Sequence, residues 1–355
     1  MLKTPLYDIH LSLNARIAPF GGWLMPIQYS GIIDEHNWVR KSAGLFDICH
    51  MGEFSVQADL AKSNLSSLVT INLEGMPLGA CRYGFMLNEQ GGIIDDLLVY
   101  RITKTEWMIV VNAATTNGDF AHLEKHLNKE TRIENISQSL GKLDLQGPLS
   151  AEVADLIGLG IKELRYYTFG YFNLLGEKII ISRTGYTGEL GYELYMPNDK
   201  IPELWKKILD DPRVKPIGLG ARDTLRLEMG YSLYGQDIDK NTTPLEAGLK
   251  HFIDWDKEFI GKDALLKQKR AHMICFIADS RRSPRHNYRI IYKDQDVGSV
   301  TSGSFSPSLG FGIGMGYVSC ELPLGEQIVL SENSISINAK VTSKPFYKNG
   351  SAKLK

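Results

Sequence analysis

Hydrophobic and polar residues alternate in several short stretches of the first half of the chain, a spacing typical of half-buried strands. These predicted strands occupy residues 51–57, 83–88, 93–101 and 107–113. Between them, apolar residues recur at helical spacing, which predicts helices at 31–44, 58–69 and 118–129. The first of these helices has acidic residues in its opening turn, basic residues in its last turn and Gly44 as its expected end.

A second series of elements begins near residue 140. Strands are predicted at 142–148, 177–185 and 191–197, and helices at 148–156, 201–211 and from about Gly220 onward. Because strands and helices mix without strict alternation, the pattern favours an α+β fold over a doubly wound one. After about residue 270, short strands and Gly/Ser turns replace the helical signals, which predicts a separate C-terminal β domain.

Composition narrows the class of protein. The 355 residues suffice for two or three domains, and Lys plus Arg (40) nearly equals Asp plus Glu (41), so we expect neither a nucleic-acid nor a membrane partner. The apolar runs are too short to cross a bilayer, and the first residues lack a signal-type hydrophobic segment. Four scattered cysteines without a C-x-x-C pair indicate a reducing compartment, so a cytoplasmic location is expected.

Two adjacent carboxylates, Asp95 and Asp96, interrupt the apolar strand predicted at 93–101. Charged groups in such a place cost free energy unless they are paired, solvated or used. Successive strand side chains point to opposite faces, so only one of the two can face a given cleft. One interpretation is that one acid pairs with a basic residue and the other is solvated at the start of the strand. The other interpretation is that one of the acids is catalytic. Physical reasoning alone somewhat favours the first, and both stay open at this point.

Other stretches are unusual in composition. The segment 183–194 is a Tyr/Thr/Gly-rich turn that carries Glu189 and Glu193, and ARDTLRLEMG (221–230) crowds four charges onto one helix, where they could simply form an ion-pair ladder. The basic run 281–289 is usually a solvated loop but could dock a partner.

Known cofactor motifs are weak or incomplete. HLEKH (122–126) spaces two histidines as a helical metal site would, but Glu124 does not fit the zinc-protease pattern and no third ligand is placed nearby. The glycine-rich segments 218–223 and 310–316 do not complete G-x-G-x-x-G. We therefore expect no metal and no dinucleotide.

Eight stretches in order carry a much more specific signal. They are LYDIHLSLNARIAPFGGWLMPIQY, VRKSAGLFDICHMGEF, LNEQGGIIDDLLVY, VVNAATTNGDF, LQGP, SRTGYTGELGYEL, GLGARDTLRLEMGYSLYGQDID and GSVTSGSFSPSLG. Together they resemble the aminomethyltransferase (T-protein) family of the glycine cleavage system, from about Thr4 to KPFY at 344–347. Cys49 departs from the Ser that is usual in this family, without consequence for catalysis.

The resemblance implies three domains around a central channel: residues 1–50 plus 140–270, residues 51–139, and a β-barrel-like domain at 271–355. It implies that tetrahydrofolate binds in the channel and takes the methylene of an aminomethyl group carried by the dihydrolipoyl arm of the H-protein, with release of ammonia. Asp96 matches the catalytic acid. A single fixed carboxylate there can orient the folate amine and stabilise developing positive charge. The implied folate-binding residues are Met51, Tyr100, Asn112, Glu193, Arg222 and, more weakly, Tyr347.

In this interpretation Asp95 is structural, anchored by backbone amides or a basic side chain. Two alternatives remain. A related folate-dependent demethylase would take a methyl group from a small sulfur or nitrogen compound. A folate-binding regulatory or tRNA-modification protein would carry a K-G-C-Y signature, which the matching region EFIGKDAL (258–265) lacks.

Overall fold

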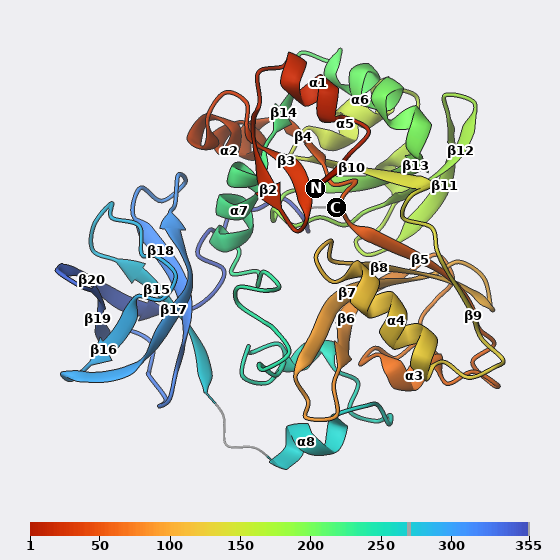
Figure 1. The fold of residues 1–355 in the computed structure, drawn as a ribbon. Helices are drawn as coiled ribbons and strands as arrows, with labels where there is room; N and C mark the ends of the chain where they lie inside the picture. The colour runs from red at the N-terminus through yellow and green to blue at the C-terminus, as the bar shows by residue number, and fades with distance from the viewer. Residues whose placement is uncertain (268–270, 354–355) are drawn as a thin grey trace.

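A computed structural model describes residues 1–267 and 271–353. The described chain forms a mixed six-stranded sheet, an antiparallel five-stranded sheet, a small third sheet and a closed C-terminal barrel. In Figure 1 the barrel stands to one side of the other sheets. The α+β class and the C-terminal barrel predicted from the sequence are both confirmed.

The first sheet has six strands in the order β11-β12-β13-β10-β4-β14 and is covered by helices. Its core combines strand residues such as Leu143 and Leu145 with Trp205 and Ile208 from one covering helix. The strands are β4 (Ala43–Asp47), β10 (Leu140–Gln146), β11 (Phe169–Leu174), β12 (Glu177–Ser182), β13 (Gly191–Pro197) and β14 (Val214–Ile217). The helices are α1 (Tyr7–Ser12), α2 (Ile32–Lys41), α5 (Ser150–Leu156), α6 (Ile201–Leu209) and α7 (Leu219–Glu228), with short 3₁₀ turns at Ile161–Glu163 and Asn198–Lys200.

The second sheet has five strands in the order β6-β7-β8-β5-β9. Helix α4 lies against it in Figure 1, and Phe120 from this helix packs edge to face on Phe54 at a centroid distance of 5.4 Å. The elements are β5 (Gly52–Gln57), α3 (Leu65–Leu68), β6 (Cys81–Leu87), β7 (Ile93–Arg101), β8 (Glu106–Val111), α4 (Thr116–His126) and β9 (Arg132–Asn135). Strand β7 starts and ends where the alternation predicted.

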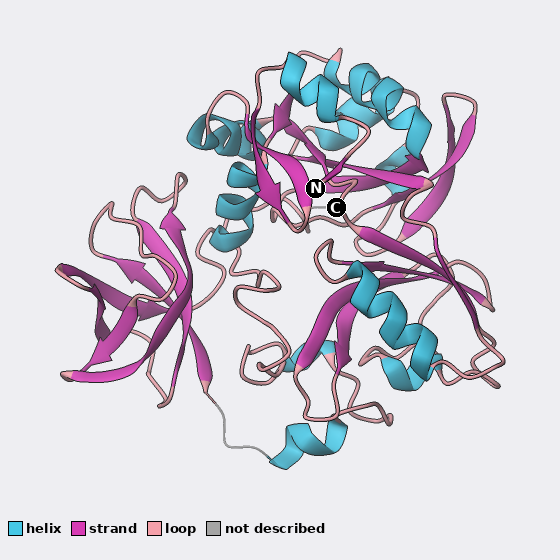
Figure 2. Cartoon of the chain, viewed as in Figure 1, coloured by secondary structure: helices cyan, strands magenta, loops and turns pink. Residues whose placement is uncertain are grey.

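The C-terminal barrel closes in the order β15-β18-β17-β16-β19-β20 and is blue in Figure 1. Figure 2 shows it built from strands and loops. Its strands are β15 (His272–Ala278), β16 (Arg289–Tyr292), β17 (Gln295–Phe305), β18 (Gly312–Val318), β19 (Gln327–Glu332) and β20 (Ile335–Thr342). The small sheet comprises β1 (Leu2–Lys3), β3 (Trp23–Gln28) and β2 (Arg16–Phe20).

Residues 230–261 connect α7 to α8 (Lys262–Lys267) mainly through turns, with one 3₁₀ turn at Lys250–Phe252. Ile238, Leu249 and Phe259 of this segment pack with Phe85 and Ile93 of the second sheet. The predicted domain division places the segment with the first sheet instead. That division stays a prediction, and its boundary at 270–271 adjoins residues 268–270, which lie outside the described residues.

Two predicted helices are wrong in extent. The helix predicted at 31–44 ends at Lys41. Gly44 lies inside β4, where strand pairing brings a would-be Cβ within 2.5 Å of the Val39 and Ile217 side chains, so the glycine is required by close packing and does not end the helix. The helix predicted at 58–69 is reduced to Leu65–Leu68, since Asp59 and Ser63 accept or donate turn hydrogen bonds that compete with a longer helix. Of the helices in the described ranges, none has the length and apolar composition needed to cross a bilayer.

Candidate active site

Burial along β7 follows the alternation that the sequence predicted. Ile93, Asp95 and Leu97 are buried, whereas Ile94, Asp96 and Leu98 are half-buried. Asp95 and Asp96 therefore occupy opposite faces of one strand. The face of Asp96 is the more accessible one.

Asp96 receives a hydrogen bond on each carboxylate oxygen. The Tyr83 hydroxyl donates to Oδ2 at 2.9 Å, and Asn112 Nδ2 donates to Oδ1 at 2.8 Å. Burial, together with the neighbouring Asp95 charge, raises the pKa of Asp96 to about 7. In the described ranges no Lys or Arg forms an ion pair with Asp96. The result is a carboxylate that is hydrogen-bonded but not neutralised.

Asp95 is held from the other side by three donors. The backbone N–H of Asn112 (2.9 Å) and the Thr115 hydroxyl (3.0 Å) donate to Oδ2, and Asn112 Nδ2 (2.8 Å) donates to Oδ1. The prediction that a backbone amide anchors Asp95 is therefore confirmed. The other side-chain donors to Asp95 are an asparagine and a threonine, and not the basic side chain that was the alternative prediction. Asn112 thus joins both acids through one amide nitrogen.

A second polar cluster lies on β10, β12 and β13 of the first sheet. The Thr184 hydroxyl donates to Glu193 Oε2 at 2.6 Å and contacts the Ser182 hydroxyl at 2.7 Å. Ser182 contacts the Tyr100 hydroxyl at 3.0 Å, and Tyr100 contacts the Tyr195 hydroxyl at 2.8 Å. This chain of hydroxyls connects Tyr100, on the strand of Asp96, with Glu193.

Each carboxylate of this second cluster faces a cation. Asp144 and Glu193 are cross-strand neighbours, an arrangement that is unfavourable for two like charges. Arg222 Nη1 donates to Asp144 Oδ2 at 2.7 Å, and Lys142 Nζ lies 3.7 Å from Glu193 Oε1. Burial raises the pKa of Asp144 to about 6 although Arg222 lowers it. The two ion pairs balance the two acids.

Tyr186 packs on Arg222 of the second cluster. Its ring faces the Arg222 guanidinium, with the carbon at 5.0 Å from the ring centroid, and its hydroxyl donates to the Ser232 carbonyl. Burial raises the pKa of Tyr186, and the charges of both Asp96 and Arg222 act on it. Arg222, on helix α7, therefore contacts the tyrosine whose pKa the Asp96 charge also raises.

The remaining predicted residues lie at the margins of these clusters. Met51 is half-buried and packs against the apolar groups that contain Phe46 and Tyr100. The Tyr347 ring stacks on the Arg40 guanidinium at 4.2 Å, and its N–H donates to the Glu228 carbonyl. The structure thus brings Asp96 and Asn112 into contact and links Tyr100 with Glu193. It gives Tyr347 no contact with either cluster among those recorded for the described residues.

Sequence reasoning missed several polar residues of these clusters, chiefly Tyr83, Lys142 and Asp144. Lys142 and Asp144 alternate in the apolar strand GKLDLQ, the same signal that drew attention to Asp95 and Asp96. Both side chains are fully buried. The alternation therefore could have identified these two residues from the sequence, whereas Tyr83 is identified only through its hydrogen bond to Asp96 in the fold.

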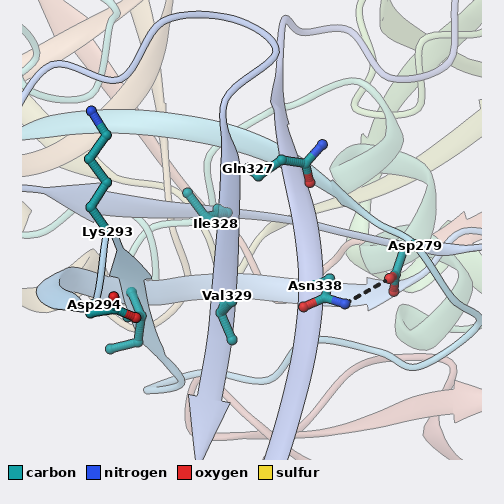
Figure 3. Close-up of a pocket in the computed structure, with 8 residues that line it drawn as sticks. Asp279, Lys293, Asp294, Gln327, Ile328, Val329 and Asn338 are labelled. Atoms are coloured by element: carbon teal, nitrogen blue, oxygen red, sulfur yellow. Dashed lines mark hydrogen bonds between the residues drawn. The ribbon is translucent and has the colours of Figure 1, made fainter.

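The pocket found on the barrel does not coincide with either cluster. It has a volume of about 280 Å³ and is shown in Figure 3, where Asn338 donates to Asp279 at 3.2 Å. Its lining includes Lys293, Asp294 and Ile328 from the β16–β17 turn and β19. No titratable group of the two clusters lines it, so it carries no part of the site.

In the segment 122–126, whose spacing resembles a helical metal site, the rings of His122 and His126 lie with centroids 4.3 Å apart and are tilted by 40° to each other. Burial, His126 and Lys125 lower the pKa of His122 to about 4. Within residues 1–267 and 271–353, no group of three or more His, Cys, Asp or Glu side chains could hold a metal ion.

The accessible face of Asp96 suits a ligand that offers an N–H. Each of its oxygens accepts one protein hydrogen bond, whereas a carboxylate can accept about four in all. Beside Glu193, the buried Lys142 Nζ and Glu53 Oε1 lack hydrogen-bond partners. The acceptor capacity of Asp96, together with buried polar atoms near Glu193 that make no hydrogen bond, fits a polar heterocyclic ligand such as a folate.

Comparisons with known proteins agree over the whole chain. The profile of the GCVT N-terminal domain matches residues 6–257, and that of the glycine cleavage T-protein C-terminal barrel domain matches residues 271–348. An aminomethyltransferase of Halothermothrix orenii is 45% identical over 356 residues, which cover 98% of this chain and 100% of the relative. One of Thermotoga maritima is 40% identical over 357 residues, 98% of each chain. The crystal structure of glycine cleavage system aminomethyltransferase T from Bartonella henselae matches with a TM-score of 0.93 at 33% identity and covers 99% of both chains. The chain therefore belongs to the aminomethyltransferase (T-protein) family of the glycine cleavage system.

Proposed function

We propose that this chain is the aminomethyltransferase that moves the methylene of an aminomethyl group, carried on the dihydrolipoyl arm of the H-protein, to tetrahydrofolate with release of ammonia. The observation that carries the proposal is Asp96, a half-buried carboxylate that lacks a cationic partner among the described residues. Methylene transfer from nitrogen and sulfur to nitrogen develops positive charge, and an uncompensated carboxylate stabilises such charge better than one already paired.

Asp96 is the catalytic residue in this proposal. Tyr83 and Asn112 hold its two oxygens, so its direction is fixed before the substrate arrives. A pKa near 7 means that Asp96 can also accept or return a proton near neutral pH. Tetrahydrofolate supplies the nitrogen atoms that receive the methylene.

The folate-binding residues are proposed to be Asn112 near Asp96, Glu193 on β13 and Arg222 on α7. The side-chain nitrogen Nδ2 of Asn112 donates to both aspartates. The side-chain oxygen Oδ1 of Asn112 is then the atom that can accept a hydrogen bond from a ligand N–H. Met51 and Tyr100 supply apolar and aromatic surface beside them, and Tyr347 is a weaker member.

The proposed macromolecular partner is a lipoylated H-protein, and no metal is required. Arg281, Arg282 and Arg285 are proposed contacts for an acidic partner surface; Arg281 also stacks on the Phe305 ring at 4.8 Å. A cytoplasmic location is proposed because all four cysteines are free thiols, as in reducing compartments.

The experiment that tests this function is methylenetetrahydrofolate formation from aminomethylated H-protein and tetrahydrofolate. Turnover that depends on both substrates, together with ammonia release, is the expected result. If the chain instead removed a methyl group from a small sulfur or nitrogen compound and ignored the H-protein, the demethylase alternative would replace this proposal.

A further inference from the structure

His50 is a buried histidine that no other part of the described chain hydrogen-bonds. It lies in the turn between β4 and β5, directly before Met51, and 6% of its surface is exposed. Among the described residues, none donates to or accepts from either ring nitrogen, and Nδ1 is fully buried. A buried polar atom of this kind costs free energy unless a water or a ligand satisfies it.

The hairpin of β2 and β3 places a partly exposed aromatic ring beside this histidine. Gly21 and Gly22 form its two-residue turn with φ of 54° and 88°, values that such a turn requires and that glycine adopts without strain. Phe20, directly before the turn, packs edge to face on the His50 ring with the centroids 5.6 Å apart. Phe20 is itself 37% exposed. Apolar surface therefore lies open next to the unpartnered imidazole.

The same hairpin turn packs against the segment that follows Asn112. A Cβ at Gly21 would lie 3.3 Å from the Cβ of Ala113. Asn112, the residue before Ala113, donates to Asp96. The hairpin thus connects His50 on one side with the surroundings of Asp96 on the other, and His50 borders the proposed site.

The chemistry of the two substrates decides which of them suits His50. The polar edges of a folate are already assigned to Asn112, Glu193 and Arg222. The other substrate is an arm of methylenes and sulfur that ends in a single amine. An exposed phenyl ring can pack on the apolar part of such an arm, and one unpartnered imidazole can bind its one polar group.

We propose that His50 hydrogen-bonds the amine of the aminomethyl group and that Phe20 contacts the arm that carries it. This inference rests on the proposed function. A neutral imidazole has one donor and one acceptor, so His50 can bind the amine before transfer and the ammonia that leaves. Burial lowers the pKa of His50 to about 4. His50 is therefore neutral near pH 7 and does not repel a protonated amine.

The reverse reaction of the full-length enzyme tests the amine contact, because ammonia is then a separate substrate. The methylene returns from the folate to sulfur and nitrogen. The thiol and ammonia each lose one proton, and the two folate nitrogens take these up. The substrates are methylenetetrahydrofolate, dihydrolipoyl H-protein and ammonium chloride at varied concentration. His50→Phe keeps a ring and removes both nitrogens, so the KM for ammonia should rise roughly tenfold, the scale of one lost hydrogen bond.

The affinity for tetrahydrofolate separates this contact from a general loss of structure. Measured by calorimetry, it should be unchanged in His50→Phe. His272→Phe, the same substitution at an exposed position, is the matched control and should keep both wild-type values. His50→Asn and His50→Gln each retain a polar atom near one ring nitrogen, and at least one of them should recover the low KM for ammonia.

Three results would each overturn the inference. The first is an unchanged KM for ammonia in His50→Phe. The second is a loss of tetrahydrofolate affinity as large as the rise in that KM, which would assign His50 to the folate. The third is no recovery in either His50→Asn or His50→Gln.

Phe20→Ala tests the arm contact and replaces the first comparison if His50→Phe fails to fold. In the forward reaction its KM for aminomethylated H-protein should rise, while its affinity for tetrahydrofolate stays unchanged. Leu324→Ala, at an exposed position in the loop between β18 and β19, is its control. A Phe20→Ala enzyme with the KM of this control would overturn the assignment of the arm.

This inference and the proposed function fail in different ways. If the chain is not an aminomethyltransferase, the wild type shows no reverse reaction that depends on ammonia. If only the inference is wrong, the wild type shows that reaction and His50→Phe uses ammonia with the wild-type KM.

Discussion

Two groups of buried carboxylates in this molecule are treated in opposite ways. Asp96 accepts hydrogen bonds but forms no ion pair with any cation in the described part of the chain, and burial raises its pKa to about 7. Glu228, at the end of α7, accepts from Arg40, Ser306 and Ser308 and lies 3.2 Å from His36 Nε2. Although burial acts to raise it, His36 and Arg40 lower the pKa of Glu228 to about 2.

The difference indicates what each group is for. The contacts of Glu228 join α2, α7 and the barrel segment 305–309. Arg40 also binds Glu189 at 2.7 Å. The Glu228 carboxylate therefore holds parts of the fold together. The Asp96 charge is left available on an accessible face. A carboxylate that serves as a scaffold is fully paired, whereas one that meets a changing charge is not.

The largest effect on stability is expected where a fully paired group loses its partner. Arg40→Met would leave Glu189 and Glu228 buried without their cation, and we expect a loss of about 3–5 kcal/mol in the free energy of unfolding. Denaturant titration measures it, with Arg165→Met at an exposed position as the control. If Arg40→Met were as stable as this control, the claim that Glu228 is a structural, fully paired carboxylate, in contrast to Asp96, would be wrong.

A smaller effect is expected at Arg222, which is paired with Asp144 and proposed to bind folate. Arg222→Ala should weaken tetrahydrofolate binding by about 1.5–3 kcal/mol through loss of a charge-assisted contact. Because the substitution also strands Asp144, the double variant Arg222→Ala, Asp144→Asn separates lost binding from lost structure. Unchanged affinity by calorimetry in both Arg222→Ala and Glu193→Ala would remove these residues from the site.

Removal of the uncompensated charge should stabilise the fold at the expense of activity. A carboxyl whose pKa is raised by folding contributes stability below its unfolded pKa and loses it as pH rises through the folded value, here from about 4 to 7. Asp96→Asn should therefore gain at least about 1 kcal/mol over the wild type at pH 8, since one pKa unit corresponds to about 1.4 kcal/mol. The gain should vanish near pH 4. A melting temperature that is equal to the wild type at both pH values would speak against an uncompensated Asp96.

The smallest effect concerns the exposed charges of the barrel. Association with the H-protein should slow as salt is added, since Arg281, Arg282 and Arg285 are proposed to act at long range. The triple alanine variant should lose most of this salt dependence while its tetrahydrofolate affinity stays unchanged. The measurement is the association rate of the enzyme with the H-protein at two ionic strengths. A wild-type rate that does not change with salt would exclude the three arginines as a docking surface.

The placement of Asp95 and Asp96 on opposite faces of one strand, and the presence of the barrel, could be predicted from the sequence because both depend on strand periodicity and turns. The facing of Asp95 and Asp96 follows from the alternation in β7, and the barrel follows from its short strands and turns. The bridge that Asn112 forms between Asp95 and Asp96 could not be predicted, since it depends on how β8 pairs with β7. Gly44 was misplaced because its role comes from the close approach of Val39 and Ile217, which no local pattern records.

The central claim is that Asp96 acts through its charge, and its rate of methylenetetrahydrofolate formation tests that claim most directly. Asp96→Asn keeps the shape and the hydrogen-bonding neighbours, so we expect it to fold and bind tetrahydrofolate but to lose roughly two or more orders of magnitude in rate. Asp199→Asn, the same substitution at an exposed position, should keep the full rate. An Asp96→Asn enzyme that turns over as fast as Asp199→Asn would contradict the account.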